Sequence, residues 1–243
     1  MDIKIFEELG STNDYLKNNK ELLKENFLAV YAKKQISGRG RNENKWFCGD
    51  NLDLAFSFVY QPEIVISQIP VITLLTGLSV YKTLFKILNG PSELKIKWPN
   101  DILYSDKKLC GILCERISFD EHKNCIIVGI GINVNSVKFP ALLNNQAISL
   151  KQITKKEFEL FSLLDEITNN IQTFFQKLPD KGINEDLRFE ILEASHSIGK
   201  YVQFSDENIV LKGIITDIAP DGCLVVEEDL TKKRYKVLEA SFI

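Results

Sequence analysis

The sequence predicts an α+β protein in which helices pack on a mixed sheet, followed by a small β-barrel. Three observations lead to this fold class. Segments of alternating apolar and polar residues between residues 27 and 134 indicate strands. An apolar repeat at helical spacing over 74–88 indicates a long helix. After residue 197, short strands with tight turns replace the helices. We therefore expect a main domain over 1–196 and a C-terminal SH3-like β-barrel domain over 197–243.

Composition narrows the class of protein. The chain has 243 residues, of which 44% are hydrophobic and 26% charged, as is usual for a soluble globular protein. The net charge of −3 argues against a general nucleic-acid binder. The five cysteines are scattered without C-x-x-C spacing, which favours reduced thiols in the cytosol. No signal peptide and no apolar run long enough to span a bilayer is evident, so we expect a cytoplasmic protein without membrane or nucleic-acid partners.

The first third of the chain contains one predicted helix and two predicted strands. Ser11-Thr12-Asn13-Asp14 resembles a capping box and is expected to open a helix that runs through Leu23. Residues 27–32 read as a strand. Residues 52–59 alternate leucine and phenylalanine with Asp, Ala, Ser and Val, the period-2 pattern of another strand.

The middle of the chain continues the mixed pattern. The helix over 74–88 should stop at Asn89-Gly90-Pro91. A short strand over 95–98 should end at Pro99-Asn100-Asp101.

Two further strands over 108–115 and 125–134 are expected to be antiparallel neighbours across a turn near 120–121. Helical stretches over 155–177 and 184–196 follow. We expect the domain boundary near 196–198. The C-terminal part is expected to hold four short strands, over 200–204, 209–218, 223–227 and 234–238.

The most informative motif is Gly38-Arg39-Gly40-Arg41, followed by Trp46. Alternate glycines let a backbone approach a ligand closely, arginine forks suit phosphate or carboxylate oxygens, and an aromatic side chain can cover a planar ring. The composition favours a nucleotide-like ligand, although a flexible solvated turn would look the same. The chain has neither a G-x-G-x-x-G fingerprint nor a G-x-x-x-x-G-K-[ST] P-loop.

Two more constellations carry polar groups at strand ends. In Lys97-Trp98-Pro99-Asn100-Asp101 a cation and two polar side chains flank a rigid break, which could face a ligand or form a polar turn. Lys107 and Lys108 come next, and on a strand they point to opposite faces. Cys110, Ile112 and Cys114 share one face, and we interpret both thiols as core residues rather than metal ligands.

A glycine-interrupted strand is the last constellation. Gly129 and Gly131 alternate with isoleucines before Asn133, so that one face of the strand lacks side chains. Such a face makes room for something flat or for another closely packed element.

Together these motifs resemble those of biotin protein ligases, over nearly the whole chain. The segments that carry the resemblance are Ser11-Thr12-Asn13, Gln35 with Gly38-Arg39-Gly40-Arg41, Trp46, Lys97-Trp98-Pro99-Asn100-Asp101, Lys108-Leu109-Cys110-Gly111-Ile112-Leu113 and Gly129-Ile130-Gly131-Ile132-Asn133. The resemblance implies a class II synthetase-like catalytic domain. It also implies ATP-dependent attachment of biotin to a lysine of a biotin carboxyl carrier protein, through biotinyl-5′-AMP. A lipoate–protein ligase, or a non-catalytic sensor of biotin or biotinyl-AMP, are the alternatives.

The resemblance also assigns roles to individual residues. Lys108, Arg39 and Asp101 are implied to be catalytic. The implied biotin-binding residues are Ser11, Thr12, Asn13, Gln35, Gly38, Arg39, Gly40, Lys108, Gly111, Gly129 and Gly131. The implied ATP-binding residues are Arg39, Gly40, Arg41, Trp46, Lys97, Asn100, Lys108 and Asn133. Mg²⁺ is expected with ATP, and its protein ligands are not identified by the sequence.

Two departures from the family pattern affect these expectations. Residues 42–44 carry no basic side chain, where the family often has one, which bears on how the loop clamps phosphate. The Ser11-Thr12-Asn13 motif begins almost at the first residue, so we expect a monofunctional enzyme rather than one with an N-terminal DNA-binding domain. Homodimerisation and the identity of the acceptor carboxylase, acetyl-CoA carboxylase or a related enzyme, remain open.

Overall fold

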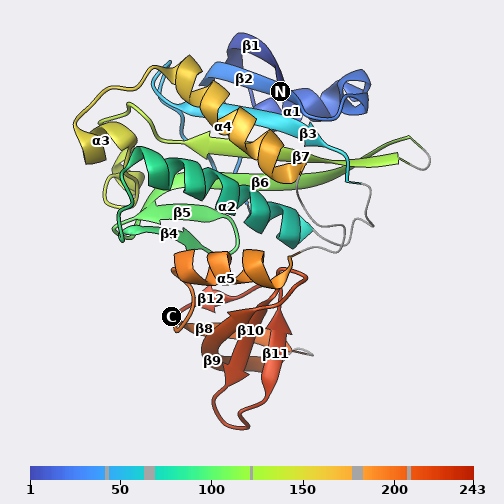
Figure 1. The fold of residues 1–243 in the computed structure, drawn as a ribbon, viewed down its shortest axis with the longest axis vertical. Coiled ribbons are helices and arrows are strands. Elements are labelled where there is room, and N and C mark those ends of the chain that lie inside the picture. The colour runs from blue at the N-terminus through green and yellow to red at the C-terminus, as the bar shows by residue number, and fades with distance from the viewer. Residues whose placement is uncertain (42–43, 63–68, 121–122, 177–182, 207–208) are drawn as a thin grey trace.

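A computed structural model describes residues 1–41, 44–62, 69–120, 123–176, 183–206 and 209–243. Its centre is a seven-stranded mixed sheet, in which only the β1–β2 pair is parallel (Figure 1). In spatial order the strands are β1 (Asp2–Leu9), β2 (Leu28–Gln35), β3 (Leu54–Tyr60), β7 (Lys123–Ile132), β6 (Lys107–Asp120), β5 (Asp101–Tyr104) and β4 (Leu94–Lys97).

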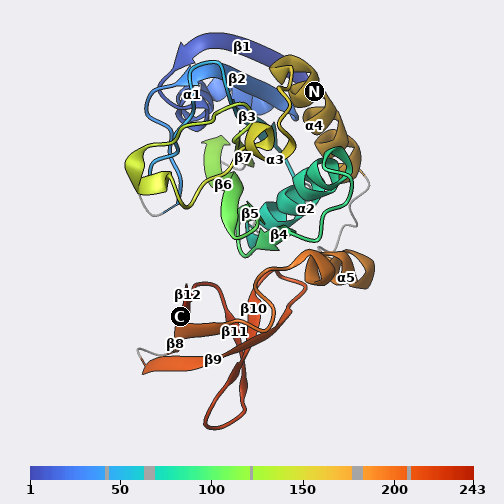
Figure 2. The same ribbon diagram turned by 90° about the vertical axis from the view of Figure 1, so that its left-hand side faces the viewer.

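Helices cover the two faces of this sheet unequally. The long helices α2 (Ile69–Ile87) and α4 (Leu160–Phe175) pack on one face, and together with the sheet they enclose the largest apolar core. The short helix α1 (Thr12–Asn18) and the 3₁₀ helix η1 (Lys20–Lys24) cover part of the other face (Figure 2). Strand β3 shows why both faces are occupied: Phe56 and Phe58 enter the large core, while Val59 enters the smaller one.

The predicted helix over 155–177 is wrong at its start. The chain instead forms α3 (Leu150–Thr154), ends it at Lys155 in the left-handed conformation (φ 62°), and begins α4 only after Glu159. Glu159 caps α4 by accepting hydrogen bonds from the backbone N–H groups of Phe161 and Ser162. Glutamate is not among the residues preferred at an N-cap, so no signal in the sequence marks a helix start here. A 3₁₀ turn, η2 (Ala141–Leu143), precedes α3. The helix expected over 184–196 is present as α5 (Glu185–Ala194).

Strands β1 and β5 were not expected from the sequence. Strand β1 lies at the edge of the sheet and none of its residues is fully buried, so its composition lacks the apolar alternation of a half-buried strand. Strand β5 has only four residues directly after the Pro99 turn. The other strands expected in the large sheet are present.

The predicted antiparallel pair is confirmed as β6 and β7, in a register that places Gly111 opposite Gly131. The turn expected between them falls at residues 121–122, outside the described residues. A β-bulge interrupts the pairing of β6 with β5, because Ile102 pairs with Cys110 and Leu103 with Lys108. Leu109 is therefore the extra residue, and both it and Cys110 are buried in the large core.

The C-terminal part forms a separate five-stranded antiparallel sheet, as expected for a small β domain. Its strands are β8 (Tyr201–Asp206), β9 (Ile209–Ile218), β10 (Leu224–Glu228), β11 (Arg234–Val237) and β12 (Ser241–Phe242). Helix α5 lies between the two sheets (Figure 1). Trp98 joins a core shared with this sheet, and its indole N–H donates to the carbonyl of Gly222 at 3.0 Å.

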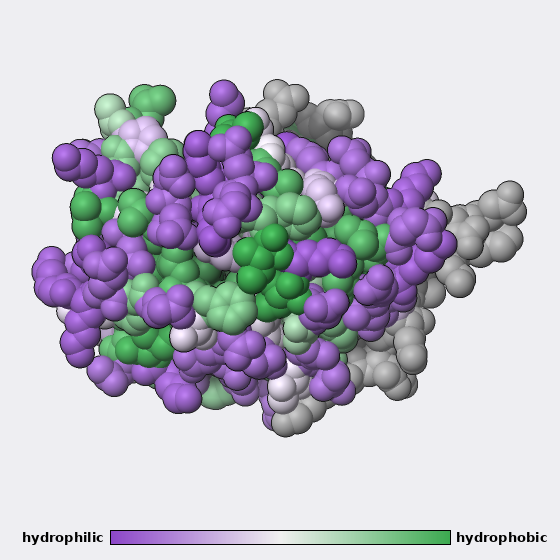
Figure 3. Space-filling view, turned by 90° about the horizontal axis from the view of Figure 1, so that it is seen from above, coloured by the Kyte–Doolittle hydropathy of each residue, from purple (hydrophilic) through white to green (hydrophobic). Residues whose placement is uncertain are grey.

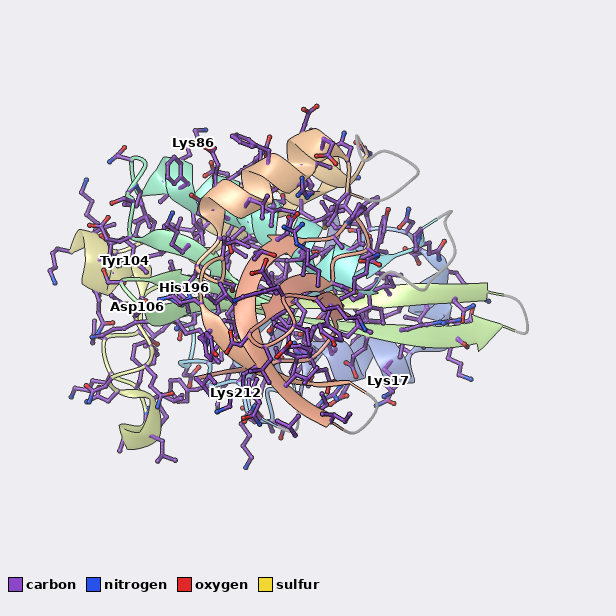
Figure 4. All side chains as sticks on the ribbon, turned by 90° about the horizontal axis from the view of Figure 1, so that it is seen from below. Lys17, Lys86, Tyr104, Asp106, His196 and Lys212 are labelled. Carbon is purple, nitrogen blue, oxygen red and sulfur yellow. The ribbon has the colours of Figure 1, made fainter. Side chains whose placement is uncertain are left out.

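His196, just after α5, lies with Nε2 2.8 Å from Oδ1 of Asp106 in the β5–β6 turn, and the two side chains are neighbours in Figure 4. Seen from above, polar side chains dominate the periphery and apolar groups gather near the middle (Figure 3). Among the described residues, no helix has the length and apolar character needed to cross a bilayer.

Asp53 is completely buried and accepts hydrogen bonds from two segments of backbone. Its Oδ1 accepts from the N–H groups of Val134 (2.8 Å) and Ser136 (3.3 Å). Its Oδ2 accepts from the N–H of Gly49 (2.9 Å) and the hydroxyl of Ser136 (2.5 Å). The carboxylate thus ties the segment before β3 to the segment after β7.

We expect Asp53→Ala to lower the free energy of unfolding by about 3 kcal/mol, because three buried backbone N–H groups would lose their acceptors. Urea denaturation of the variant measures this loss. Asp50→Ala, at an exposed position three residues earlier, is the control and should change stability by less than about 0.5 kcal/mol. A loss below about 1 kcal/mol for Asp53→Ala would contradict a structural role for this network.

Candidate active site

The N-terminus of α1 supplies one end of the site. Ser11 is the N-cap, as predicted, and its hydroxyl accepts from the N–H of Asp14 at 3.3 Å. The amide oxygen of Gln35, at the end of β2, accepts from the backbone N–H of Thr12 at 2.9 Å and lies 3.2 Å from the Thr12 hydroxyl. Two segments separated by 23 residues therefore meet through one side-chain amide.

Asn13 is buried beside them and is held from both ends of its amide. Its Nδ2 donates to Oε2 of Glu115 at 2.8 Å and to the carbonyl of Leu113 at 3.3 Å. The hydroxyl of Ser57 lies 2.6 Å from Oδ1 of Asn13 and 2.6 Å from the Thr12 hydroxyl. A Cβ at Gly129 would lie 2.2 Å from Oδ1 of Asn13, so this glycine makes room for the amide.

The floor of the site is the backbone of the paired glycines Gly111 and Gly131, covered by the indole of Trp46. A Cβ at Gly131 would lie 2.2 Å from Cε2 of Trp46, and one at Gly111 would lie 2.9 Å from Cζ3. The face without side chains predicted from the glycine spacing is thus filled by a flat ring of the protein itself. The indole Nε1 is buried and has no hydrogen-bond partner among the described residues.

The Gly/Arg segment is fixed in place at Arg39. Nη2 of Arg39 lies 2.6 Å from Oδ1 of Asp14 and 2.8 Å from Oε2 of Glu115. Burial disfavours the charged guanidinium, but the hydrogen bonds and charges of Glu115 and Asp14 outweigh it and raise the pKa of Arg39. Backbone bonds from Gly40 to Asn44 (2.7 Å) and from Trp46 to Gly38 (2.9 Å) join the two sides of the loop.

The Arg41 side chain differs from that of Arg39 in having no ion pair or hydrogen bond to any residue in the described part of the chain, although the Arg41 carbonyl accepts from the N–H of Asn44 at 3.1 Å. It lines the central cavity and also the adjoining cleft toward the C-terminal sheet. Considering the described residues alone, Arg41 is the arginine of the motif whose guanidinium is not already paired with a carboxylate.

Lys108 is the second cation of the site. Its Nζ lies 2.7 Å from Oδ1 of Asp101 and 5.6 Å from the centre of the Trp46 ring. Simple alternation along β6 would place Lys108 on the face of Cys110, in the core. The bulge at Leu109 turns it to the face of Gly111, where its Cε approaches that glycine.

The two cysteines on this strand pack in the core, as predicted. Burial raises the pKa of both the Cys110 and the Cys114 thiols, so they stay protonated. No group of three or more metal-ligating side chains occurs within the described ranges.

Most predicted site residues line one cavity of about 170 Å³. They are Ser11, Thr12, Asn13, Gln35, Arg39, Gly40, Arg41, Trp46, Asn100, Asp101, Lys108, Gly111, Gly129 and Gly131.

The structure does not bring Gly38, Lys97 or Asn133 to that cavity. A Cβ at Gly38 would lie 2.4 Å from the Trp46 carbonyl oxygen, so this glycine serves the loop hairpin. Asn133 is buried and donates to the carbonyls of Lys108 (3.0 Å) and Ile148 (3.2 Å), which makes it a support for the Lys108 backbone. Lys97 faces the adjoining cleft of about 670 Å³, with Nζ 5.1 Å from the Phe242 ring centre.

Sequence reasoning missed three polar partners: Asp14, Ser57 and Glu115. Ser57 and Glu115 could have been found by alternation, because they share strand faces with Ala55 and Gly111, which line the cavity. Asp14 was assigned to capping only, and its contact with Arg39 depends on the tertiary fold.

Comparison with known proteins shows what this arrangement resembles. The model of the biotin/lipoate A/B protein ligase family matches residues 5–133. The bifunctional ligase/repressor BirA of Bacillus spizizenii is 34% identical over 211 residues, covering 85% of this chain and 63% of that protein. The BirA protein of Escherichia coli is 26% identical over 228 residues, covering 93% of this chain and 70% of that protein. The chain thus spans less than two thirds of the length of the Bacillus relative.

Solved structures agree with this relationship. The biotin protein ligase of Aquifex aeolicus, in complex with biotin and ATP, has a TM-score of 0.83 and 27% identity, and the match covers 100% of this chain and 97% of that one. The expected catalytic fold, a mixed sheet with packed helices, is therefore confirmed. Because the family model matches more than half of its residues, this chain belongs to the biotin/lipoate A/B protein ligase family.

Proposed function

We propose that the protein ligates biotin to a specific lysine of a biotin carboxyl carrier protein, with ATP as cosubstrate and biotinyl-5′-AMP as intermediate. One observation carries this proposal: neutral polar side chains line the same cavity as the cations Arg41 and Lys108, and both the Trp46 ring and Lys108 lie against the backbone of Gly111. The relatives named as biotin ligases, and the biotin and ATP complex of the Aquifex protein, support the same assignment.

The neutral end of the cavity suits the ureido ring of biotin. That ring has two N–H donors and one carbonyl acceptor, and Thr12, Asn13 and Gln35 offer amide and hydroxyl groups of both kinds. No carboxylate is needed to bind an uncharged ring. Asp14 and Glu115, the two carboxylates in contact with this end, both pair with the Arg39 guanidinium.

In the first reaction a carboxylate oxygen of biotin attacks the α-phosphorus of ATP, and pyrophosphate leaves. Both reactants are anionic, so cations are needed to reduce their repulsion and to stabilise charge on the five-coordinate phosphorus. We assign this work to Lys108 and Arg41. Arg39, expected from the sequence to be catalytic, serves in this proposal to fix the loop, because its guanidinium is already paired with two carboxylates.

In the second reaction the amine of the carrier lysine attacks the acyl carbon, and AMP leaves. Positioning the amine is the main requirement, because AMP is a good leaving group. Asp101 pairs with Lys108 here. Once Lys108 turns to phosphate, the Asp101 carboxylate becomes free to accept a hydrogen bond from the incoming amine.

Mg²⁺ is proposed as part of MgATP rather than as a metal resident in the protein. Mg²⁺ often binds through substrate phosphates plus one or two carboxylates and keeps several waters. The described residues offer no cluster that would hold it alone, and Asp101, the carboxylate in the cavity, is paired with Lys108. Bound with ATP, it would neutralise the β- and γ-phosphates.

The test is incubation with biotin, MgATP and a biotin carboxyl carrier domain, read by intact-mass spectrometry. We expect the carrier to gain one biotinyl group on one lysine, and no product without ATP. Lipoate with its own carrier domain is the parallel arm, because the family includes lipoate ligases. Lipoylation without biotinylation would overturn the biotin assignment, and binding of biotin without transfer would identify a sensor instead.

A further inference from the structure

Glu115 lies at a junction that the reaction does not explain. It stands on β6 beyond the glycine floor, and its side chain is only 19% exposed. Its carboxylate accepts from Nδ2 of Asn13 (2.8 Å) and from Nη2 of Arg39 (2.8 and 3.0 Å). Lys17 on α1, labelled in Figure 4, approaches it at 4.0 Å. One carboxylate therefore contacts both the neutral end of the cavity, which we call the head pocket (Thr12, Asn13 and Gln35), and the Gly38–Arg41 segment.

The contact with Asn13 decides how that side chain is oriented. An amide held at Nδ2 by Glu115 and the Leu113 carbonyl must present its Oδ1 toward Ser57 and Gly129. If Glu115 were absent, the amide could rotate and exchange donor for acceptor. The polarity presented to a ligand in the head pocket thus depends on Glu115.

The contact with Arg39 links this orientation to a distant segment. Arg39 and Glu115 are 76 residues apart, yet two hydrogen bonds join the guanidinium to the carboxylate. Asp14 also pairs with Arg39, with oxygens at 2.6 and 3.0 Å, but among the described contacts its carboxylate makes no hydrogen bond to the Asn13 side chain. Both carboxylates therefore hold Arg39, but only Glu115 also orients Asn13.

We propose that Glu115 is a positioning residue that orients Asn13 for the head of the ligand and couples it to Arg39, so that biotin affinity and anchoring of the Gly38–Arg41 segment depend on the same carboxylate. This inference rests on the proposed function for the identity of the ligand. The anchoring can be measured without any ligand.

Three variants separate the two tasks. Glu115→Leu removes both contacts. Glu115→Gln keeps a side-chain oxygen that can accept from Asn13 but removes the charge that pairs with Arg39. Asp14→Asn weakens only the Arg39 pair. Glu7→Gln, in an exposed pair with Lys33, is the control for loss of a surface carboxylate.

Two measurements are made on each full-length variant. The first is the rate at which trypsin cleaves after Arg39 without ligand, read by mass spectrometry. We expect faster cleavage in Glu115→Leu, Glu115→Gln and Asp14→Asn, and no change in Glu7→Gln. The second is the Kd for biotin by titration calorimetry without ATP. We expect a rise of roughly tenfold in Glu115→Leu and of less than about threefold in Glu115→Gln and Asp14→Asn.

A double-mutant cycle tests the coupling directly. Arg39→Ala should raise the biotin Kd in the wild-type background and have at least about threefold less effect when Glu115 is already leucine. Independent effects in this cycle, or an unchanged Kd in Glu115→Leu, would overturn the proposal. If wild-type protein fails to bind biotin, the proposed function is wrong, whereas the cleavage rates still decide whether Glu115 anchors Arg39. Circular dichroism identifies any variant that does not fold, and the Gln and Asn variants keep the shape of the native side chains.

Discussion

Replacing Lys108 with alanine is expected to slow formation of biotinyl-AMP by about 10²- to 10³-fold, the usual effect of removing one preorganised donor from developing charge. The ammonium has a fixed position between the Asp101 carboxylate and the Trp46 ring, in the cavity that also holds Arg41. Biotin-dependent pyrophosphate release measures the first reaction without the carrier protein. The biotin Kd should change much less than the rate, because Lys108 acts on charge that develops in the transition state.

Lys107→Ala is the matched control, because it removes the same charge from the adjacent residue, which does not line the cavity. Its rate should stay within about twofold of the wild type, as expected for an ordinary surface substitution. Equal losses in the two variants would show that overall charge, and not the position of Lys108, governs the reaction. A wild-type rate in Lys108→Ala would remove Lys108 from the catalytic residues.

The Lys108 position also shows where sequence reasoning reached its limit. Period-2 alternation correctly placed Cys110 and Ile112 in the core, but it also placed Leu109 on the face of Gly111 and Leu113, whereas Leu109 is buried in the core beside Cys110. It could not place Lys108, because one extra residue at Leu109 reverses the phase of every position before it. Only the resemblance to the family pointed to Lys108, and the bulge supplies the physical reason.

Local signals predicted local structure well. The Ser11 cap and the strand alternation of β3 each depend on residues within a few positions of one another, and the structure has them as expected. Contacts between distant segments had no such signal. The pairing of Arg39 with Glu115 and the support that Asn133 gives to Lys108 follow from which strands become neighbours. Consequently most residues that line the cavity were predictable from the sequence, but the contacts that decide what each of them does were not.

The glycine floor gives the second large effect. Gly131→Ala adds a Cβ only 2.2 Å from Cε2, and 2.5 Å from Cζ2 and Nε1, of the Trp46 indole, so the ring must leave its present position. The displaced ring would change the shape of the cavity of about 170 Å³ that we propose as the biotin site. We expect biotin affinity to fall by about 10- to 100-fold, the equivalent of the 1–3 kcal/mol that overpacking usually costs.

Tryptophan fluorescence can detect the movement without any ligand. The chain has two tryptophans, and Trp98 is buried with its indole bonded to Gly222, so a change in emission reports mainly on Trp46. Emission of Gly131→Ala should shift to longer wavelength as the ring becomes exposed. Gly77→Ala is the control: its added Cβ meets its nearest neighbour, Ile112, at an ordinary 3.6 Å. Unchanged emission together with wild-type biotin affinity in Gly131→Ala would mean that Trp46 does not rest on this strand, and the flat floor would then have no role in binding.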